Sequence, residues 1–304
     1  MFKTIGSLLL AGSAWTLVTA ASAGDEGTAL AHPRPIRVLL VTGGHGFDHA
    51  AFMEMFRSLP DVEFKEVKQP EALRHFAPDK ADAYDVMVWY DMVQEIGEQD
   101  RKHLVALLEK GKPLVGLHHC LASYQQWPEA LRILGGRYWL KEHDGKPGST
   151  YEEGVDIRVR IADADHPITR SMKDFDIHDE VYGNIEVLPH VRPLLTVDHP
   201  GSSKVIAWTH TYGRSPVVYL QLGHGPEAYA SADYRRLVGR SIRWAAGALS
   251  DQKPASVGEP VWRLGTQAYT FRVYTFFEAI DKAKARGLNY IEAYRGQAFS
   301  PAAK

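Results

Sequence analysis

The sequence predicts an α/β protein with a mostly parallel sheet and helices on both faces of the sheet. Mostly apolar runs, typical of strands buried on both faces, lie at 36–42, 85–90 and 114–117. Segments with a helical spacing of apolar residues lie between them, at 49–59 and 98–110. This alternation of strand and helix is the pattern of βαβ units, whose strands run parallel.

Each element has its own signal along the chain. The first strand ends at Gly43-Gly44, a turn signal, and Gly111 ends the second helix. Between them we expect a further strand at 62–67. The middle of the chain is less regular, and there we expect strands at 155–161, 191–197, 204–209 and 217–222, followed by a closing helix at 231–246.

The N-terminal residues predict export. Lys3 precedes an apolar run at 5–20, and Ala21-Ser22-Ala23 fits the small-x-small pattern of signal cleavage. We therefore expect a signal peptide at 1–23, a polar leader at 24–34 and a periplasmic or secreted protein with no membrane contact after cleavage. A retained anchor is the alternative, although the run is short for a spanning helix.

A separate unit follows a linker at 250–260. Within 261–304 the sequence predicts a strand at 262–269, an amphipathic helix at 275–286 with Thr275 as N-cap, and a strand at 288–293. One βαβ unit cannot bury both faces of its strands, so this segment resembles the beginning of a larger domain.

The composition excludes some functions. A chain of 304 residues with a net charge of −2 carries no basic patch with interleaved aromatic residues, so we expect no nucleic-acid partner. The segment Gly43-Gly44-His45-Gly46 lacks both the Gly-x-Gly-x-x-Gly pattern and a Walker lysine, so no nucleotide is expected. Cys120 is the only cysteine, and no intrachain disulfide can form.

Histidines recur where predicted strands end. The pair His118-His119 directly follows the strand at 114–117, and the carboxyl ends of parallel strands are where α/β proteins place their ligands. Histidines at comparable points are His45, His49, His143, His178 and His224. This recurrence predicts one shared site.

Two chemistries fit such a histidine cluster. Neutral imidazoles with a carboxylate bind a divalent, zinc-like metal, and the ligand candidates are His118, His143, His224 and Glu180. Without a metal, His118 or His119 with Glu180 could move protons at a carbon next to a ketone. Tyr182 could then hold an oxyanion or a sugar hydroxyl. The catalytic candidates are therefore His118, His119, Glu180 and Tyr182.

The stretch 36–247 resembles the ThuA-like (trehalose-utilisation) family. The matching motifs are Thr42-Gly43-Gly44-His45, Gly116-Leu117-His118-His119, His166-Pro167-Ile168-Thr169, Asp179-Glu180-Val181-Tyr182, Ala207-Trp208 and Leu222-Gly223-His224. The resemblance implies a flavodoxin-like three-layer sandwich related to class I glutamine amidotransferases, here at 35–249. It also implies a role with glycosides or 3-keto sugars, with Gly44, His45 and Trp208 as substrate-binding candidates.

The same resemblance bears on Cys120. Amidotransferase relatives present a nucleophilic cysteine in Gly-x-Cys-x-Gly, whereas this chain has Gly116-Leu117-His118 and its cysteine two residues later. A cysteine glutaminase is therefore not expected. A buried cysteine that packs as a small apolar residue is the favoured interpretation, and a hydrolase with Cys120 as nucleophile is the alternative.

The C-terminal segment resembles the first βαβ unit of xylose-isomerase-like sugar isomerase/epimerase TIM barrels. The residues are 264–271, Phe276-Phe277-Glu278-Ala279-Ile280 and 287–292. Together these observations predict an exported carbohydrate-processing protein that acts on a glycoside or 3-keto sugar by His/Glu acid–base chemistry, with or without a metal. The alternative is a non-catalytic sugar-binding module that works with a sugar isomerase or oxidoreductase.

Overall fold

The computed structural model describes residues 34–249 and, nearer the C-terminus, 265–267, 271, 273–285, 290–292 and 298. The signal peptide predicted at 1–23 and the linker predicted at 250–260 lie outside these residues. The chain divides into two units, Met1–Lys253 and Pro254–Lys304, which are described separately.

A nine-stranded mixed sheet forms the centre of the first unit. Its strands are β1 (Ile36–Gly43), β2 (Val62–Lys68), β3 (Val86–Asp91), β4 (Leu114–Leu117), β6 (Thr150–Ile161), β7 (Phe175–Gly183), β9 (Arg192–Val197), β10 (Val205–Tyr212) and β11 (Ser215–Leu220). Their spatial order is β2-β1-β3-β4-β11-β10-β9-β6-β7. Within residues 34–249, β5 (Gly136–Arg137) and β8 (Glu186–Val187) form a small separate pair.

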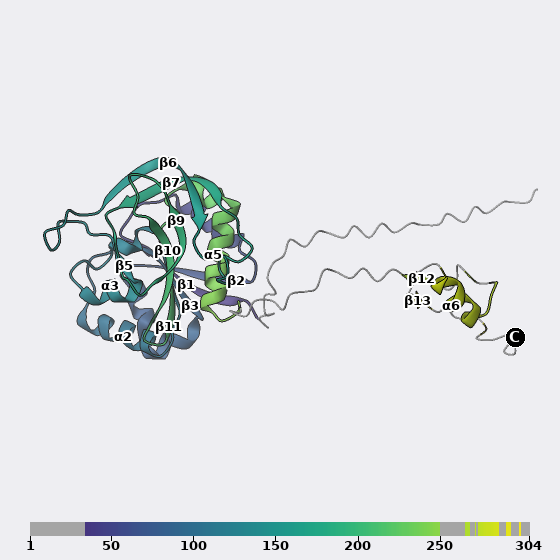
Figure 1. The fold of residues 1–304 in the computed structure, drawn as a ribbon. Helices are drawn as coiled ribbons and strands as arrows, with labels where there is room; N and C mark the ends of the chain where they lie inside the picture. The colour runs from purple at the N-terminus through teal and green to yellow at the C-terminus, as the bar shows by residue number, and fades with distance from the viewer. Residues whose placement is uncertain are drawn as a thin grey trace, which may run out of the picture. The chain divides into compact units, whose positions relative to one another are not determined.

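The sheet has a parallel half and an antiparallel half, so it is more mixed than the mostly parallel sheet that the sequence predicts. Strands β2, β1, β3, β4 and β11 pair in parallel. From β11 onward, the strands β10, β9, β6 and β7 pair antiparallel. The β6–β7 arm lies at one end of the fold, above β9 and β10 in Figure 1.

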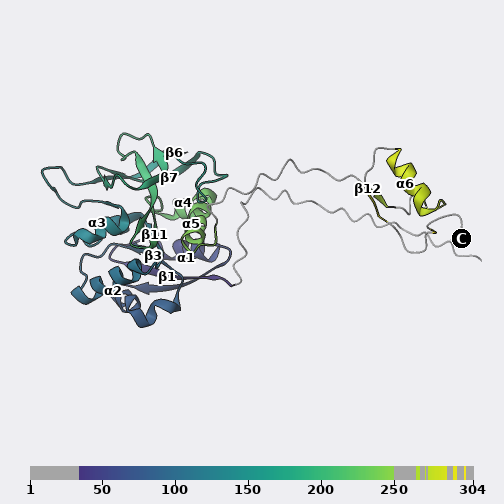
Figure 2. The same ribbon diagram turned by 60° about the horizontal axis from the view of Figure 1, so that its bottom comes forward.

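Helices cover both faces of the parallel half. They are α1 (His49–Arg57), α2 (Glu98–Glu109), α3 (Pro128–Leu134), α4 (Pro226–Ala230) and α5 (Ala232–Ala245). Alternate residues of β1 enter two separate cores: Val38 and Leu40 pack with α1 and α5, whereas Leu39 and Val41 pack with α2 and α3. Figures 1 and 2 show α2 and α5 on opposite sides of the strands. The result is the three-layer α/β arrangement that the sequence predicts.

The second unit contains β12 (Gly265–Gln267), α6 (Phe276–Lys284) and β13 (Tyr290–Glu292). The two strands pair in parallel. Thr275 caps α6, because its hydroxyl accepts from the Glu278 backbone N–H while the Glu278 carboxylate accepts from the Thr275 backbone N–H. The relation of this second unit to a TIM barrel stays a prediction. Among the described residues of the whole chain, no helix combines the length and apolar character needed to cross a bilayer.

Candidate functional site

The turn after β4 presents His118 at the carboxyl end of the parallel half. Leu117 is still extended, with φ of −119°, and His118 turns into the left-handed region with φ of 50° before the short helix η3 (His118–Ala122). A non-glycine residue in this conformation costs on the order of 1–3 kcal/mol and is found mainly where function requires it. The strained turn aims the buried His118 ring across β11 toward β7.

Three side chains from distant segments meet there, and we call them the His–Glu–His triad: His118, Glu180 and His224. The Glu180 Oε2 atom lies 2.9 Å from His118 Nε2 and 3.0 Å from His224 Nδ1. The two ring nitrogens are 3.1 Å apart. Glu180 projects from β7, and His224 lies in the loop between β11 and α4.

The protein itself decides which His118 nitrogen carries a proton. His118 Nδ1 lies 2.6 Å from the Gln221 carbonyl oxygen, which can only accept, so Nδ1 donates. Nε2 then offers a lone pair to the centre of the triad unless it gains a second proton. Burial alone would raise the pKa of Glu180, but its interactions with the two neighbouring imidazoles, His118 and His224, lower it to about 2. The carboxylate is therefore held as an anion.

The donor set of the triad fits a divalent metal. Two imidazoles and one carboxylate, with further positions left for water or substrate, are a set found at catalytic zinc sites. The three ligand atoms all lie within 4.8 Å of one another. The three pairs of ligand atoms are 2.9, 3.0 and 3.1 Å apart, so one ion could contact all three. The residues present therefore suit a metal ion by their type and by their closeness.

A second carboxylate fastens the loop that carries His224. Asp179 accepts from the backbone N–H groups of Gly223, at 2.7 Å, and His224, at 2.9 Å. The Tyr90 hydroxyl also donates to the Gly223 carbonyl at 2.8 Å. Because Asp179 and Glu180 are neighbours on β7, one strand fixes both the loop and the triad. The hydrogen bond to Glu180 raises the pKa of His224.

A second histidine pair borders the triad. The ring centroids of His45 and His119 are 4.5 Å apart, and His119 lies 5.3 Å from His118. His119 is buried, and neither of its ring nitrogens has a hydrogen-bond partner within the described residues. Burial lowers its pKa well below the usual value, and the nearby Tyr90 backbone opposes this only in part. A neutral, unpartnered imidazole at a cavity wall is suited to bind a ligand oxygen.

Two neighbouring cavities open over these residues. The inner one, about 190 Å³, is lined by His45, Met92, His119, Ala122, Tyr138, Leu140, Tyr151, Glu153, Glu180, Tyr182 and His224. The outer one, about 530 Å³, extends over Gly46–Asp48, His178 and the start of α4. Glu153 and His224 line both, so they mark the junction. Tyr182 also donates toward the triad, with its hydroxyl 2.9 Å from His118 Nε2.

Five predicted site residues line the inner cavity: His45, His119, Glu180, Tyr182 and His224. His118 is fully buried behind them and reaches the site through its contacts with Glu180 and His224. Gly44 supports His45 indirectly: its φ is +78°, and a Cβ there would lie 2.4 Å from the Met92 carbonyl oxygen, so only glycine lets the two loops approach.

Two predicted site residues do not join the site. His143 lies outside the triad in the loop after α3, where its ring stacks on Trp139 at 3.6 Å and pairs with Asp144. Trp208 is fully buried in the core, and its indole N–H donates to the Leu134 carbonyl at 2.8 Å. A ligand cannot reach a side chain in that position, which argues against the substrate-binding role assigned to Trp208.

The residues that β6 contributes to the inner cavity were not predicted from the sequence. Tyr151 and Glu153 line the inner cavity, yet the sequence predicts that this strand begins only at 155. The signal was present in the segment Tyr151-Glu152-Glu153-Gly154, where an aromatic residue and two carboxylates precede a glycine of φ +66°.

Cys120 lies behind the site and is no nucleophile in this structure. It is fully buried, and a Cβ on Gly116 would lie 2.9 Å from its Sγ atom, so it packs tightly against the strand. Burial, with a further contribution from Asp91, raises the pKa of the thiol well above its usual value. A protonated, inaccessible thiol cannot attack a substrate.

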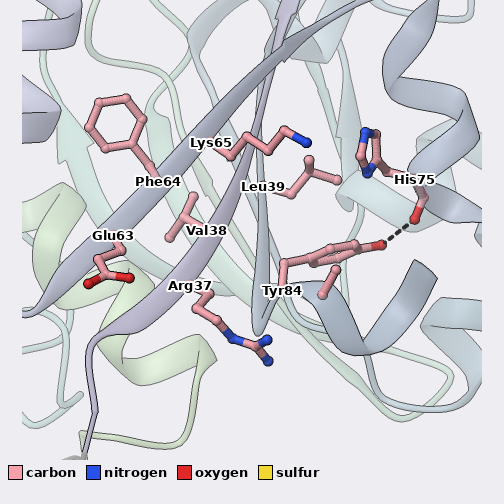
Figure 3. A pocket seen from close by; sticks show the side chains of 9 residues that line it. Arg37, Val38, Leu39, Glu63, Phe64, Lys65, His75 and Tyr84 are labelled. Atoms are coloured by element: carbon pink, nitrogen blue, oxygen red, sulfur yellow. Dashed lines mark hydrogen bonds between the residues drawn. The ribbon is translucent and has the colours of Figure 1, made fainter.

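A further cavity lies at the other end of the parallel strands. It has a volume of about 220 Å³ and is lined by Arg37, Val38, Leu39, Glu63, Phe64, Lys65, His75, Ala83 and Tyr84. Figure 3 shows its polar groups, with the Tyr84 hydroxyl hydrogen-bonded to the His75 carbonyl. Because it adjoins the amino ends of β1 and β2, it lacks the position typical of α/β active sites.

The fold and the triad define an α/β protein with a polar, histidine-rich site over the carboxyl ends of its parallel strands. The model of the ThuA family, described as trehalose utilisation, matches residues 37–245, and the chain belongs to this family. A comparison with curated proteins gives no match.

Solved structures share the fold. A putative ThuA-like protein from Parabacteroides merdae is 20% identical with a TM-score of 0.62, over 72% of this chain and 93% of that one. A putative ThuA-like protein from Bacteroides uniformis is 18% identical with a TM-score of 0.55, over 73% and 96%. At these sequence identities the structural likeness supports the fold alone. The chemistry has to be argued from the residues of the site.

Proposed function

We propose that this protein is a carbohydrate-processing enzyme that acts on a glycoside or 3-keto sugar with the help of a divalent metal bound by the His–Glu–His triad. The observation that carries the proposal is the triad itself, two of whose members, Glu180 and His224, line the inner cavity beside the unpartnered imidazole nitrogens of His119. Membership of a trehalose-utilisation family supports a sugar as the ligand.

The surroundings of the triad suit a sugar. Tyr138, Tyr151 and Tyr182 line the inner cavity, and aromatic rings pack against the apolar faces of sugars while their hydroxyls reach polar groups. Tyr151 is 62% exposed, so its ring is available at the cavity mouth. Charged and hydrogen-bonding groups line the same cavity, as is usual for small-molecule sites.

The chain's own residues would then divide the work. His118, Glu180 and His224 would hold the metal, which when bound supplies a Lewis acid for a ketone or hydroxyl oxygen. His119 would hydrogen-bond a substrate oxygen through its free ring nitrogen, and Tyr182 would donate its hydroxyl in the same region. Histidine and glutamate side chains of the cavity wall would move the proton at the carbon next to the ketone.

Two broader parts of the proposal rest on sequence. The N-terminal segment supports export to a periplasm or the medium. The C-terminal segment supports cooperation with a sugar isomerase or with an oxidoreductase, the class of enzyme that generates keto sugars.

Metal analysis of the purified chain tests the central claim. Wild type, His118→Ala and His103→Ala would each be incubated with zinc, passed through a desalting column and analysed for bound metal. His103 lies on α2 and bonds Gln99, away from both cavities, so its variant controls for the loss of a histidine. About one zinc per chain in wild type and in His103→Ala, and none in His118→Ala, supports the proposal. Equal metal in all three proteins contradicts it.

One observation favours a non-catalytic sugar-binding module instead. The triad atoms already contact one another at 2.9–3.1 Å, so they could serve as a static polar network beneath a bound sugar. Sugar binding and turnover of 3-keto glycosides by wild type and His118→Ala separate the two functions. An enzyme loses turnover in the variant and keeps much of its binding, whereas a binding module shows no turnover in either protein.

A further inference from the structure

Strand β6 carries a bulge directly opposite Glu180. Glu152 pairs with Val181 and Val155 pairs with Asp179, so Glu153 and Gly154 together face the single residue Glu180. Gly154 has a φ of +66°, which a residue with a side chain adopts only with strain. Bulges of this kind redirect a side chain and are frequent beside active sites.

The redirected side chain is that of Glu153, and it lies at the junction of the two cavities. Glu153 lines both of them, and its carboxylate is 58% exposed. Its Oε1 atom is 3.9 Å from His224 Nε2, which is beyond hydrogen-bond distance. Among the described residues it has no closer polar partner, so both carboxylate oxygens remain available to a ligand.

Glu180 is in the opposite situation. Its Oε2 atom is shared by both imidazoles of the triad, and its side chain is only 6% exposed. A carboxylate held in this way can bind a metal or orient the rings, but it cannot also approach a substrate carbon. Two glutamates therefore line the inner cavity. Of the two, only the Glu153 carboxylate has no hydrogen bond within the described residues.

We propose that Glu153 is the general base of the reaction, the group that removes the proton from the carbon next to the ketone of a 3-keto sugar. In this step the carbon–hydrogen bond breaks and the proton passes to a Glu153 oxygen. The bonding electron pair forms a carbon–carbon double bond, and the ketone becomes an enolate. Return of the proton reverses the step, so no oxidant or reductant is needed. The inference rests on the proposed sugar chemistry and identifies the residue that acts as its base.

Hydrogen exchange in deuterium oxide isolates this step from any later bond cleavage. The zinc-loaded full-length chain would be mixed with a methyl 3-ketoglucoside, and proton NMR would follow the loss of the signal at the carbons beside the ketone. The variants are Glu153→Gln and, as the matched control, Glu152→Gln, which removes a carboxylate from the neighbouring residue outside both cavities. Binding of the same ketone and the zinc content are measured in parallel.

We expect Glu153→Gln to slow exchange by about 100-fold or more, the usual range for loss of a general base. Its zinc content and its ketone affinity should stay within about threefold of wild type, and Glu152→Gln should exchange at the wild-type rate. Exchange by Glu153→Gln at the wild-type rate overturns the role of Glu153 and leaves the proposed function intact. If wild type itself catalyses no exchange although it binds zinc, the keto-sugar chemistry is wrong and the role of Glu153 falls with it.

Discussion

Replacing Asp91 by asparagine should make the protein more stable at high pH. Asp91 ends β3 and is fully buried, and its Oδ1 atom has no hydrogen-bond partner within the described residues. Burial raises the pKa of this carboxyl to about 7, and the hydrogen bond from Gln69 Nε2, at 3.1 Å, opposes the rise only in part. Asparagine has nearly the same shape and keeps an acceptor for Gln69.

The sign and the size follow from proton linkage. Between pH 4 and 7 the folded protein keeps the Asp91 proton while the unfolded chain releases it, so stability falls as the pH rises. The difference between the reference pKa of 3.8 and the folded value of about 7, at 1.36 kcal/mol per pH unit, sets an upper limit of about 4 kcal/mol. The asparagine side chain of the variant carries no such proton, so its advantage over wild type grows through this window and is constant above about pH 8.

Urea denaturation at pH 5, 6, 7 and 8 measures this advantage. Over this pH range, the free energy of unfolding of Asp91→Asn minus that of wild type should rise by about 1–3 kcal/mol. Asp198→Asn, at an exposed position, controls for the loss of one carboxylate. A difference that is flat from pH 5 to 8, or that declines, would refute the argument from burial.

Two further substitutions test the assignment of aromatic residues. Trp208→Ala should lower the free energy of unfolding by about 3–5 kcal/mol, because it empties a buried space and orphans the Leu134 carbonyl, and urea denaturation measures this loss. Tyr151→Ala should leave stability within about 0.5 kcal/mol, because the ring is largely exposed. The same change should weaken sugar binding by up to about tenfold in calorimetry if the ring stacks on the ligand. The opposite pattern, with Trp208 affecting only binding, would reverse the two assignments.

The strands of the parallel half could be read from the sequence, and so could β9, β10 and the second part of β6, which were expected at 191–197, 204–209 and 155–161. Strands β1, β3 and β4 are mostly apolar, because helices cover both of their faces. Strand β7 was missed, since Asp176, His178, Asp179 and Glu180 break its apolar pattern. Two of those polar residues are the ones that assemble the site.

The sequence could indicate which candidate site residues lie together where strand ends determine their position. His118 and His224 follow β4 and β11, which are neighbours in the sheet, so adjacency at its edge brings them together. His143, predicted as a ligand, lies away from the triad because it is in a loop, and no periodicity of the sequence specifies the path of that loop. Trp208, predicted to bind substrate, lies in the core instead. Because β10 is buried on both faces, the alternation of apolar and polar residues could not show which face of the sheet Trp208 occupies. Glu153 depends on a bulge, and the glycine that follows it is a local signal that does not specify the direction of the Glu153 side chain.

Asp179 and Glu180 are neighbours on β7 and point to opposite faces of the strand, so the site forms only when β7 is in the correct register. One carboxylate fastens the Gly223–His224 loop, and the next completes the triad. A slip of β7 by a single residue would exchange their directions and abolish both contacts at once. If the triad binds a metal ion as proposed, binding requires the antiparallel arm to be aligned with the parallel half, and metal uptake during refolding would report the moment when that alignment is complete.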